Sequence, residues 1–479
     1  MRMKVQVIIE SDGETEVVQE IATLNRGRLQ PEELGLTLAE AKDFLQGLQQ
    51  TMVTRQIVEF SEDNIRCPSC RKPRSRKGKH EIVYRTLFGK LKLESPRYYE
   101  CRCEERNKGS VSPLAELLSE RAAPELVYLE TKFASLMSYG LTVELLGEIL
   151  PLGSQINTIG VRRRLQQVAE RIESELGEEQ PHFVEGCGRD WDQLPAPDPP
   201  FTVGLDGGYV HAKDQKSRTE GWFEVIVGKS MPEEGEAKCL AFVNRYDTKP
   251  KRRLFELLKS QGMQPNQLVT FLSDGGDTVR NLPQRLNSGS EDWLDWFHIT
   301  MRLTVMGQMA KGIATEIKRP EELEENEDVN VDPAAIEKSL ERVKWFLWHG
   351  NVYRALEVIE DLDCRLESIE GRSEKQRKLL KAVKEFSNYI SANQSFIPNY
   401  GDRYLHGETI STAFVESTVN YVVSKRMVKK QQMRWSERGA HLLLQVRTQV
   451  LNEDLQTTFH RWYPRMQIRS GESEQRKMA

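Results

Sequence analysis

The chain has 479 residues, a formal net charge of -4 and 29% charged residues. This length predicts about three domains, and the composition is that of a soluble globular protein. No apolar run approaches the roughly 18 residues of a membrane helix, and the first residues turn polar too soon for a signal peptide. We therefore expect a cytoplasmic protein with no membrane partner. The net charge excludes a uniformly basic nucleic-acid binder but allows local basic patches.

The amino-terminal segment, residues 1–60, is predicted to form a hairpin and a helix. Met3 to Leu24 is typical of two strands around the turn signal Ser11-Asp12-Gly13. Thr37 and Glu40 then form a capping-box pattern ahead of a stretch with apolar residues at helical spacing. We interpret this segment as scaffold.

Four of the seven cysteines cluster in two close pairs within residues 61–110. The pairs are Cys67 with Cys70, and Cys101 with Cys103. A strand, a turn near Gly89 and a second strand separate them, which is the pattern of a zinc ribbon. We predict that the four thiolates bind Zn²⁺, with His80 as a weaker candidate ligand; the alternative is an unligated or redox-active set.

Residues 111–180 are helical by periodicity. A helix from about Thr142 ends at a break over 151–153, and a longer helix follows. In a helix-turn-helix motif the second helix would present Arg162, Arg163 and Arg164 to DNA. Two helices at such a corner also occur without DNA binding, so both interpretations are open. The proline-rich end of residues 181–200 predicts a linker.

Two apolar stretches each end in an aspartate followed by two glycines. Asp206 lies in FTVGLDGGYV and Asp274 in FLSDGGD. Asp-Gly is also a common hairpin turn, but a strand-strand-strand-helix-strand order links the two stretches. That order is typical of an RNase H-like core, in which the first and fourth strands are neighbours. Both carboxylates would then lie at adjacent strand ends, where their repulsion favours a shared divalent cation over an acid-base pair.

Two later segments carry a resemblance to a known family. The first is Asp295 to His298 in DWLDWFHITMRL, and the second is AFVESTVNYVVSKRMVKKQQMRW, which contains Glu416. Together with Asp206 and Asp274, these motifs resemble the DDE transposases of bacterial insertion sequences, in their Mutator-like branch. The resemblance covers roughly half of the chain and puts Glu416 in the place of the third acid; Glu408 is a nearby competitor.

The resemblance implies the architecture and the chemistry. The fold expected is multidomain α/β: an RNase H-like catalytic core over 201–303 and 403–455, a helical insertion over 304–402 and a basic tail over 456–479. Asp206, Asp274 and Glu416 would hold two Mg²⁺ (or Mn²⁺) ions. His298 would orient the scissile phosphate or bond a catalytic carboxylate, with a satisfied core histidine as the alternative, and Asp295 would support the site.

Positive charge gathers around the third acid. Residues 411–470 contain ten Lys or Arg against four Asp or Glu, although the whole chain is acidic. Basic helix faces are often only solvated, but the neighbouring acid favours contact with DNA phosphates. The residues predicted to make that contact are Lys425, Arg426, Lys429, Lys430 and Arg434.

The function expected is that of a DNA transposase that binds the ends of an insertion sequence and catalyses cleavage and strand transfer. Its partners would be double-stranded DNA, both element ends and target, and further copies of itself, since the family works as assemblies on paired ends. Two alternatives remain open. One is an inactive zinc-ribbon and helix-turn-helix regulator, and the other is an RNase H-like nuclease that cuts without joining.

Overall fold

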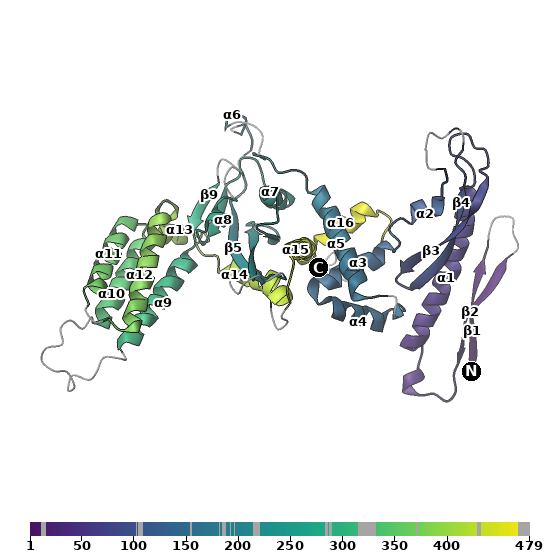
Figure 1. Ribbon diagram of the computed structural model, residues 1–479, viewed down its shortest axis with the longest axis horizontal. Helices are drawn as coiled ribbons and strands as arrows, with labels where there is room; N and C mark the ends of the chain where they lie inside the picture. The colour runs from purple at the N-terminus through teal and green to yellow at the C-terminus, as the bar shows by residue number, and fades with distance from the viewer. Residues whose placement is uncertain are drawn as a thin grey trace. The chain divides into compact units, whose positions relative to one another are not determined.

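The computed structural model describes the chain except for residues 11–15, 102, 104–108, 154–155, 182, 184–187, 192, 196, 214–220, 283–285, 287–289, 315–331, 370–371, 429–432 and 468–479. Two compact units make up the chain (Figure 1). The first contains Met1–Arg171 and Glu453–Ala479, and the second contains Ile172–Asn452. Within the described ranges, no helix combines the length and the apolar character needed to cross a membrane.

The first unit combines two hairpins with a set of helices. Its elements are β1 (Arg2–Ile9), β2 (Val17–Asn25), α1 (Leu38–Asp63), β3 (Arg76–Thr86), β4 (Gly89–Tyr98), α2 (Pro113–Leu117), α3 (Pro124–Leu136), α4 (Tyr139–Ile149), most of α5 (Thr158–Glu175) and α16 (Asp454–Trp462). The division between the units falls inside α5. Residues 456–462, which the sequence placed in a basic tail, instead belong to α16, whose Phe459 packs edge-on against Tyr128 of α3.

The amino-terminal prediction is confirmed. Strands β1 and β2 pair antiparallel, and the predicted turn at 11–13 lies outside the described residues. Helix α1 begins with the predicted capping box: the backbone N–H of Glu40 donates to Thr37 Oγ1 at 3.3 Å, and the backbone N–H of Thr37 donates to Glu40 Oε2 at 3.0 Å. This exchange satisfies backbone donors that a helix start leaves unpaired.

The strand-turn-strand prediction between the cysteine pairs is also confirmed. Strands β3 and β4 form an antiparallel hairpin that closes at Thr86 and Gly89. Gly89 has φ +127°, a conformation that L side chains rarely adopt, so glycine is needed at this turn. Ile82, Leu91 and Leu93 point from the hairpin into a core shared with α1 and α2.

The second unit is built on a five-stranded sheet. Its strands are β5 (Phe201–His211), β6 (Trp222–Met231), β7 (Lys238–Val243), β8 (Val269–Ser273) and β9 (Glu291–Leu294), in the order β7-β6-β5-β8-β9. β5 pairs parallel with β8, and β8 pairs parallel with β9, whereas β6 and β7 are antiparallel. The first and fourth strands are therefore neighbours, as the sequence predicted.

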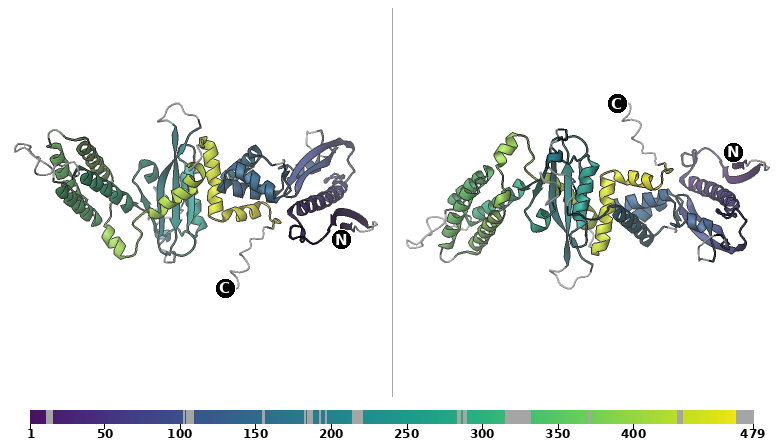
Figure 2. Two further views of the ribbon diagram at one scale, coloured as in Figure 1. Left: turned by 90° about the horizontal axis from the view of Figure 1, so that it is seen from below. Right: turned by 90° about the horizontal axis from the view of Figure 1, so that it is seen from above.

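Alternate residues of β5 face different helices, because successive side chains of a strand point to opposite faces. Val203 and Leu205 face a core shared with α7 (Pro250–Ser260) and α8 (Asp277–Arg280). Gly204 and Gly208 face the other side, where α14 (Ala413–Val419) lies across the sheet (Figure 2). Asp206 lies between these glycines and shares their face.

Helices α9 to α13 form the insertion. Their bounds are α9 (Trp296–Ala314), α10 (Pro333–Trp348), α11 (Val352–Glu367), α12 (Glu374–Ala392) and α13 (Tyr400–Leu405). α9 to α12 lie side by side around one apolar core (Figure 1). The stretches AAIEKSLERVKWFLWHG and SEKQRKLLKAVKEFSNYI, inside the predicted helical insertion, form α10 and α12, and the helical segment begins at Trp296 rather than at 304. The remaining elements of this unit are α6 (Gly188–Trp191), the π-helix η5 (Asn420–Val428) and α15 (Glu437–Leu451).

Candidate metal centres and nucleic-acid interface

The four clustered cysteines meet at the base of the β3–β4 hairpin. A tight turn brings Cys67 and Cys70 together: the N–H of Arg71 donates to the carbonyl of Cys67 at 2.8 Å, and the N–H of Cys67 donates to the carbonyl of Lys72 at 2.9 Å. Arg71 has φ +57°, the left-handed conformation that such a turn demands. Cys101 and Cys103 follow β4 and approach the same point.

The cysteine geometry fits a tetrahedral metal ion. The Sγ atoms of Cys67 and Cys103 are 3.4 Å apart, those of Cys70 and Cys101 are 3.3 Å apart, and all four lie within 4.8 Å of one another. Four thiolates at about 2.3 Å from Zn²⁺ would be separated by about 3.8 Å, so only a small expansion is needed. This group can therefore bind zinc, and His80 is not a member of it.

The two predicted aspartates lie side by side where the parallel pairing of β5 with β8 ends. Leu205 of β5 is the register partner of Ser273, the last residue of β8, so Asp206 and Asp274 are the next residues of neighbouring segments. Only Asp274 lies at a strand end, as the sequence predicted for both, because β5 continues to His211 in its pairing with β6. Local backbone donors fix both carboxylates: Gly207 N–H donates to Asp206 Oδ1 at 2.7 Å, and Gly276 N–H donates to Asp274 Oδ1 at 2.9 Å.

The pKa of Asp206 is raised. Burial is the largest cause, and the charges of Asp274 and Asp295 act in the same direction, against the lowering effects of the Gly207 N–H and of His298. These carboxylates therefore lie close enough to repel one another, which a bound cation would relieve.

Asp295 is a fully buried carboxylate that holds His298 in place. Asp295 Oδ2 lies 2.7 Å from His298 Nδ1 and also accepts the hydroxyl of Thr412, while Oδ1 accepts the N–H groups of Phe297 and Thr412, each at 2.9 Å. With Nδ1 held by Asp295, His298 keeps Nε2 for another partner. Burial would lower the pKa of His298, but the bond to Asp295 and the charges of Asp295, Asp206 and Asp274 raise it overall. The structure places Asp295 directly after β9 and His298 in the first turn of α9.

Close packing of α14 on β5 brings the third predicted acid to the same face as Asp206. A Cβ added to Gly204 would lie 2.1 Å from Val415, and one added to Gly208 would lie 3.1 Å from Val419. Glu416 is exposed and lies in the first turn of α14. Thr412, the N-cap of this helix, bonds Asp295 and so ties the start of α14 to the residue that follows β9.

The competing acid, Glu408, has a different setting. It precedes α14 and forms an ion pair with Arg403 at 2.7 Å.

The helical insertion contacts the second aspartate directly, because Tyr389 of α12 donates from its hydroxyl to the backbone carbonyl of Asp274 at 2.9 Å. Gly275 beside it has φ +82°, and a Cβ there would lie 2.5 Å from Asn393 of α12.

Among the described residues, a second group beside the cysteines has ligand atoms that converge within 4.8 Å: Glu173, Asp247 and His441. Asp206, Asp274 and Glu416 do not form such a group. Arg253, which is 7% exposed, explains the convergence of the second group, since it donates to Glu173 at 3.0 Å and to Asp247 at 3.0 Å. We interpret it as a buried ion-pair network. Sequence reasoning missed it, and no local pattern links residues as distant as Glu173 and His441.

The arginines predicted on the second helix of the helix-turn-helix lie in different settings. The helices themselves are confirmed as α4 and α5, with Asn157 capping α5 by accepting the N–H of Gly160 at 2.8 Å. Arg162 and Arg163 are exposed. Arg164 instead forms an ion pair with Glu130 of α3, which is 1% exposed, so its predicted role in a DNA groove is not supported.

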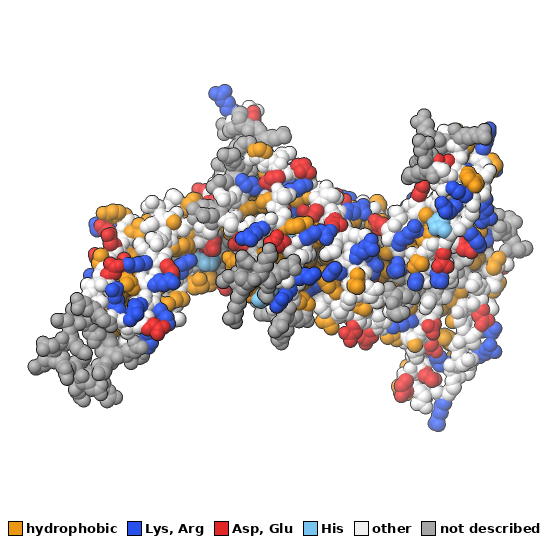
Figure 3. Space-filling view, viewed as in Figure 1, with side chains coloured by type: hydrophobic (Ala, Val, Ile, Leu, Met, Phe, Trp, Pro, Cys, Tyr) orange, Lys and Arg blue, Asp and Glu red, His pale blue; other side chains and the backbone are white. Residues whose placement is uncertain are grey.

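The basic residues near Glu416 also divide. Lys425 and Arg434 are exposed, as contact with DNA requires. Arg426 is 5% exposed and lies over the ring of Trp435, so the prediction that it faces DNA is not supported. Lys429 and Lys430 lie outside the described residues. Lys and Arg side chains are interspersed with acidic ones on the face seen in Figure 3.

Comparisons with known proteins do not assign the chain to a family. No family model matches the sequence, and no curated protein matches it. Among solved structures, a crystal structure of NurA is 12% identical with a TM-score of 0.11, covering 55% of this chain and 73% of that chain. A structure of NurA with manganese is 13% identical with a TM-score of 0.11, covering 54% and 73%. We draw nothing from likenesses this weak.

Proposed function

We propose that the chain is a DNA transposase that cleaves the ends of a mobile element and joins them to target DNA at a metal-dependent site. One observation carries the proposal: the parallel pairing of β5 with β8, which places Asp206 and Asp274 side by side where β8 ends. Ligands in open sheets of this kind bind at the carboxyl ends of parallel strands.

The sheet supports an RNase H-like core. Three antiparallel strands come first, followed by a helix and two strands parallel to the first, and this matches the order that the sequence suggested. A late helix, α14, crosses the face that carries Asp206. The proposed catalytic residues would thus come from three elements: Asp206 from β5, Asp274 from the end of β8 and Glu416 from α14.

The residues present fit Mg²⁺ or Mn²⁺. Carboxylate oxygens are ligands of hard cations. Burial is the largest cause of the raised pKa of Asp206, and the charges of Asp274 and Asp295 add to it, so a bound cation would stabilise the ionised carboxylate. A two-ion site spreads its ligands over ions about 3.5 to 4 Å apart, so Asp206, Asp274 and Glu416 need not all converge on one point. Two such ions would activate the nucleophile and stabilise the leaving oxygen.

The chain's own residues would position the phosphate. Asp295 holds the His298 ring through Nδ1, so that Nε2 can donate to a phosphate oxygen of the scissile bond. In the first step, the oxygen of water bonds to phosphorus as the bond to the 3′-oxygen breaks and that oxygen takes up a proton. In the second step, the freed 3′-hydroxyl attacks a target phosphodiester, loses its proton and displaces the target's 3′-oxygen.

The test uses a labelled oligonucleotide that carries the element's end, a target duplex and Mg²⁺. Wild type should yield both cleaved and joined products, and Asp274→Ala should yield neither above background. Equal activity of the two proteins would refute the catalytic assignment. Cleavage without joining would identify a nuclease instead, and binding of the end without either reaction would favour the regulator.

A further inference from the structure

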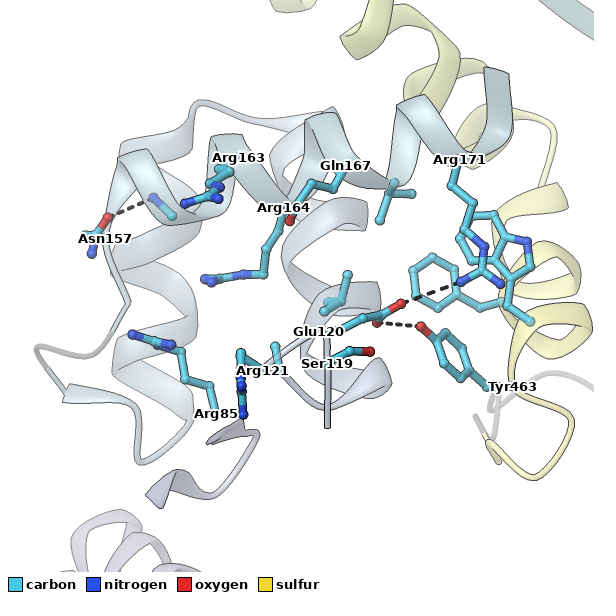
Figure 4. Close-up of a pocket in the computed structure, with 16 residues that line it drawn as sticks. Arg85, Ser119, Glu120, Arg121, Asn157, Arg163, Arg164, Gln167, Arg171 and Tyr463 are labelled. Atoms are coloured by element: carbon cyan, nitrogen blue, oxygen red, sulfur yellow. Dashed lines mark hydrogen bonds and ion pairs between the residues drawn. The ribbon is translucent and has the colours of Figure 1, made fainter. Parts of the chain in front are cut away.

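A pocket of about 560 Å³ lies in the first unit, and no site described above uses it. Its wall comes from the end of β3, the turn before α3, helix α5 and helix α16 (Figure 4). Five arginines line it: Arg85, Arg121, Arg163, Arg164 and Arg171. The volume is in the range of small-molecule sites, and the lining charge demands an anion.

Two of the five arginines are neutralised within the protein. Arg164 pairs with Glu130, and Arg171 lies 3.7 Å from Glu120 while it stacks on Trp462 at 4.1 Å. The hydroxyl of Tyr463 donates to the same Glu120 at 2.6 Å. These contacts fix one side of the pocket, as the dashed lines in Figure 4 indicate.

The other three arginines have no carboxylate within ion-pair distance among the residues that the structure describes. Arg85, Arg121 and Arg163 thus bring three guanidinium groups without a direct ion pair to one pocket, although the charge of Arg85 also acts on the buried carboxylate of Glu130. Nη1 of Arg121 is buried and has no hydrogen-bond partner within the described chain. A buried donor without a partner costs free energy, and a bound anion would supply the missing acceptor.

Backbone contacts hold two of these arginines together. Arg85 of β3 bridges Ala122: its N–H donates to the carbonyl of Arg121 at 3.1 Å, and its carbonyl accepts the N–H of Ala123 at 2.7 Å. Arg121 itself has φ +58°, a conformation that costs a non-glycine residue free energy. The strained turn fixes where the Arg121 side chain leaves the backbone. The side chains of Arg85, Arg163 and Arg164 end on the same side of the pocket in Figure 4.

We propose that this pocket binds a phosphate group through Arg85, Arg121 and Arg163. Planar guanidinium groups bind phosphate oxygens with paired hydrogen bonds, and three of them from separate elements line this one pocket. The phosphate comes either from a DNA backbone or from a small phosphate compound such as a nucleotide. The proposal stands apart from the catalytic one, because it requires no reaction and no residue of the second unit.

The test measures binding to the full-length protein without a reaction. The probes are pyrophosphate, ATP and a labelled 20-base-pair duplex, each at fixed salt and without divalent metal. The pocket variant is Arg85→Gln with Arg163→Gln, since neither side chain has an ion-pair partner among the described residues. The control is Arg2→Gln, at an exposed position of β1 in the same unit that does not line the pocket. Thermal unfolding of each variant checks that it is folded.

We expect the pocket variant to lose about tenfold or more in affinity for at least one probe, the loss typical of charge-assisted contacts. Loss for pyrophosphate and ATP, with the Arg2→Gln control within about twofold of wild type, identifies a small-phosphate site. Loss of affinity for the duplex alone identifies a DNA backbone site. The slope of log affinity against log salt concentration should then fall by the amount expected for about one or two lost phosphate contacts. If the pocket variant misfolds, Arg163→Lys gives the test, because it keeps the charge but loses the paired hydrogen bonds.

Three results would overturn the proposal. The first is a folded pocket variant that binds every probe within about twofold of wild type. The second is a wild-type protein that binds none of the probes. The third is an Arg2→Gln control that loses as much affinity for pyrophosphate and ATP as the pocket variant.

Discussion

The cysteine cluster and the proposed acidic site arrange their candidate metal ligands in opposite ways. The four cysteines come from one turn and the two ends of one hairpin, and their sulfurs lie within 4.8 Å of one another. The acids come from β5, the end of β8 and α14, with Asp206 and Asp274 directly beside each other and Glu416 on a helix flank. A closed set saturates the ion and stabilises a fold, whereas an open set leaves coordination positions for substrate.

The largest effect should follow from removing one ligand of the cysteine site. Cys70→Ser in the full-length protein should remove the zinc, because structural zinc contributes about 10 kcal/mol or more of apparent binding free energy to folding. Metal analysis should find about one zinc per wild-type chain and essentially none in the variant. Cys364→Ser, at an exposed position of α11, is the matched control and should retain the metal. Zinc retained in Cys70→Ser would contradict the four-thiolate assignment.

The activity of the proposed acidic site should depend on how α14 packs on the sheet. Gly204→Ala puts a Cβ where Val415 already lies, at 2.1 Å, so α14 must move away from β5. We expect a loss of about 1 to 3 kcal/mol in the free energy of unfolding, the usual cost of overpacking, together with a loss of cleavage. Gly307→Ala in α9, where the added Cβ meets nothing within 4 Å, is the control. Normal stability and activity of Gly204→Ala would mean that α14 does not pack as described.

The sequence predicted the geometry of the cysteine site more fully than that of the acidic site, because the cysteine site is formed by local structure. Cys67 and Cys70 share one turn, and the hairpin between the pairs is local, so residue types and spacing fix the geometry. The neighbouring positions of Asp206 and Asp274 were also predictable, because strand order decides which strands pair. The flank of α14 that carries Glu416 depends on the long-range contact of Val415 with Gly204, and the partners of Arg164 and Arg426 depend on tertiary packing. None of these leaves a periodic signal.

Acid should weaken the second unit through its buried ion-pair network. Burial would raise the pKa of Glu173, but the bond from His441 and the charge of Arg253 lower it to about 2. A lowered folded-state pKa stabilises the fold above the unfolded value of 4.5, and this stability is lost as the pH falls towards 2. The loss should reach at most about 3 kcal/mol.

Denaturant unfolding between pH 6 and pH 2.5 would measure this loss, with Glu173→Gln as the comparison. The variant should be less stable at pH 6 and show a shallower decline as the pH falls. Parallel curves for the two proteins would exclude Glu173 as a source of the pH dependence.

A smaller effect should follow from His298. His298→Asn removes a ring that Asp295 orients, without removing a carboxylate, and we expect cleavage to slow by about 10- to 100-fold. The change should lie mainly in the rate at saturating DNA rather than in DNA affinity, because a positioning contact acts on the bound phosphate. An unchanged rate would make His298 a core histidine, the alternative that the sequence left open.

The most direct test of the central claim is single-turnover cleavage of an element-end duplex in Mg²⁺ by five proteins: wild type, Asp206→Asn, Asp274→Asn, Glu416→Gln and Glu408→Gln. The first three substitutions should each slow cleavage by about a thousandfold or more, because each removes a charged ligand of a two-ion site. Glu408→Gln should cleave like wild type, since Glu408 pairs with Arg403. Cleavage by Glu416→Gln at the wild-type rate, or loss of cleavage in Glu408→Gln instead, would contradict the claim that Asp206, Asp274 and Glu416 form one site acting on DNA.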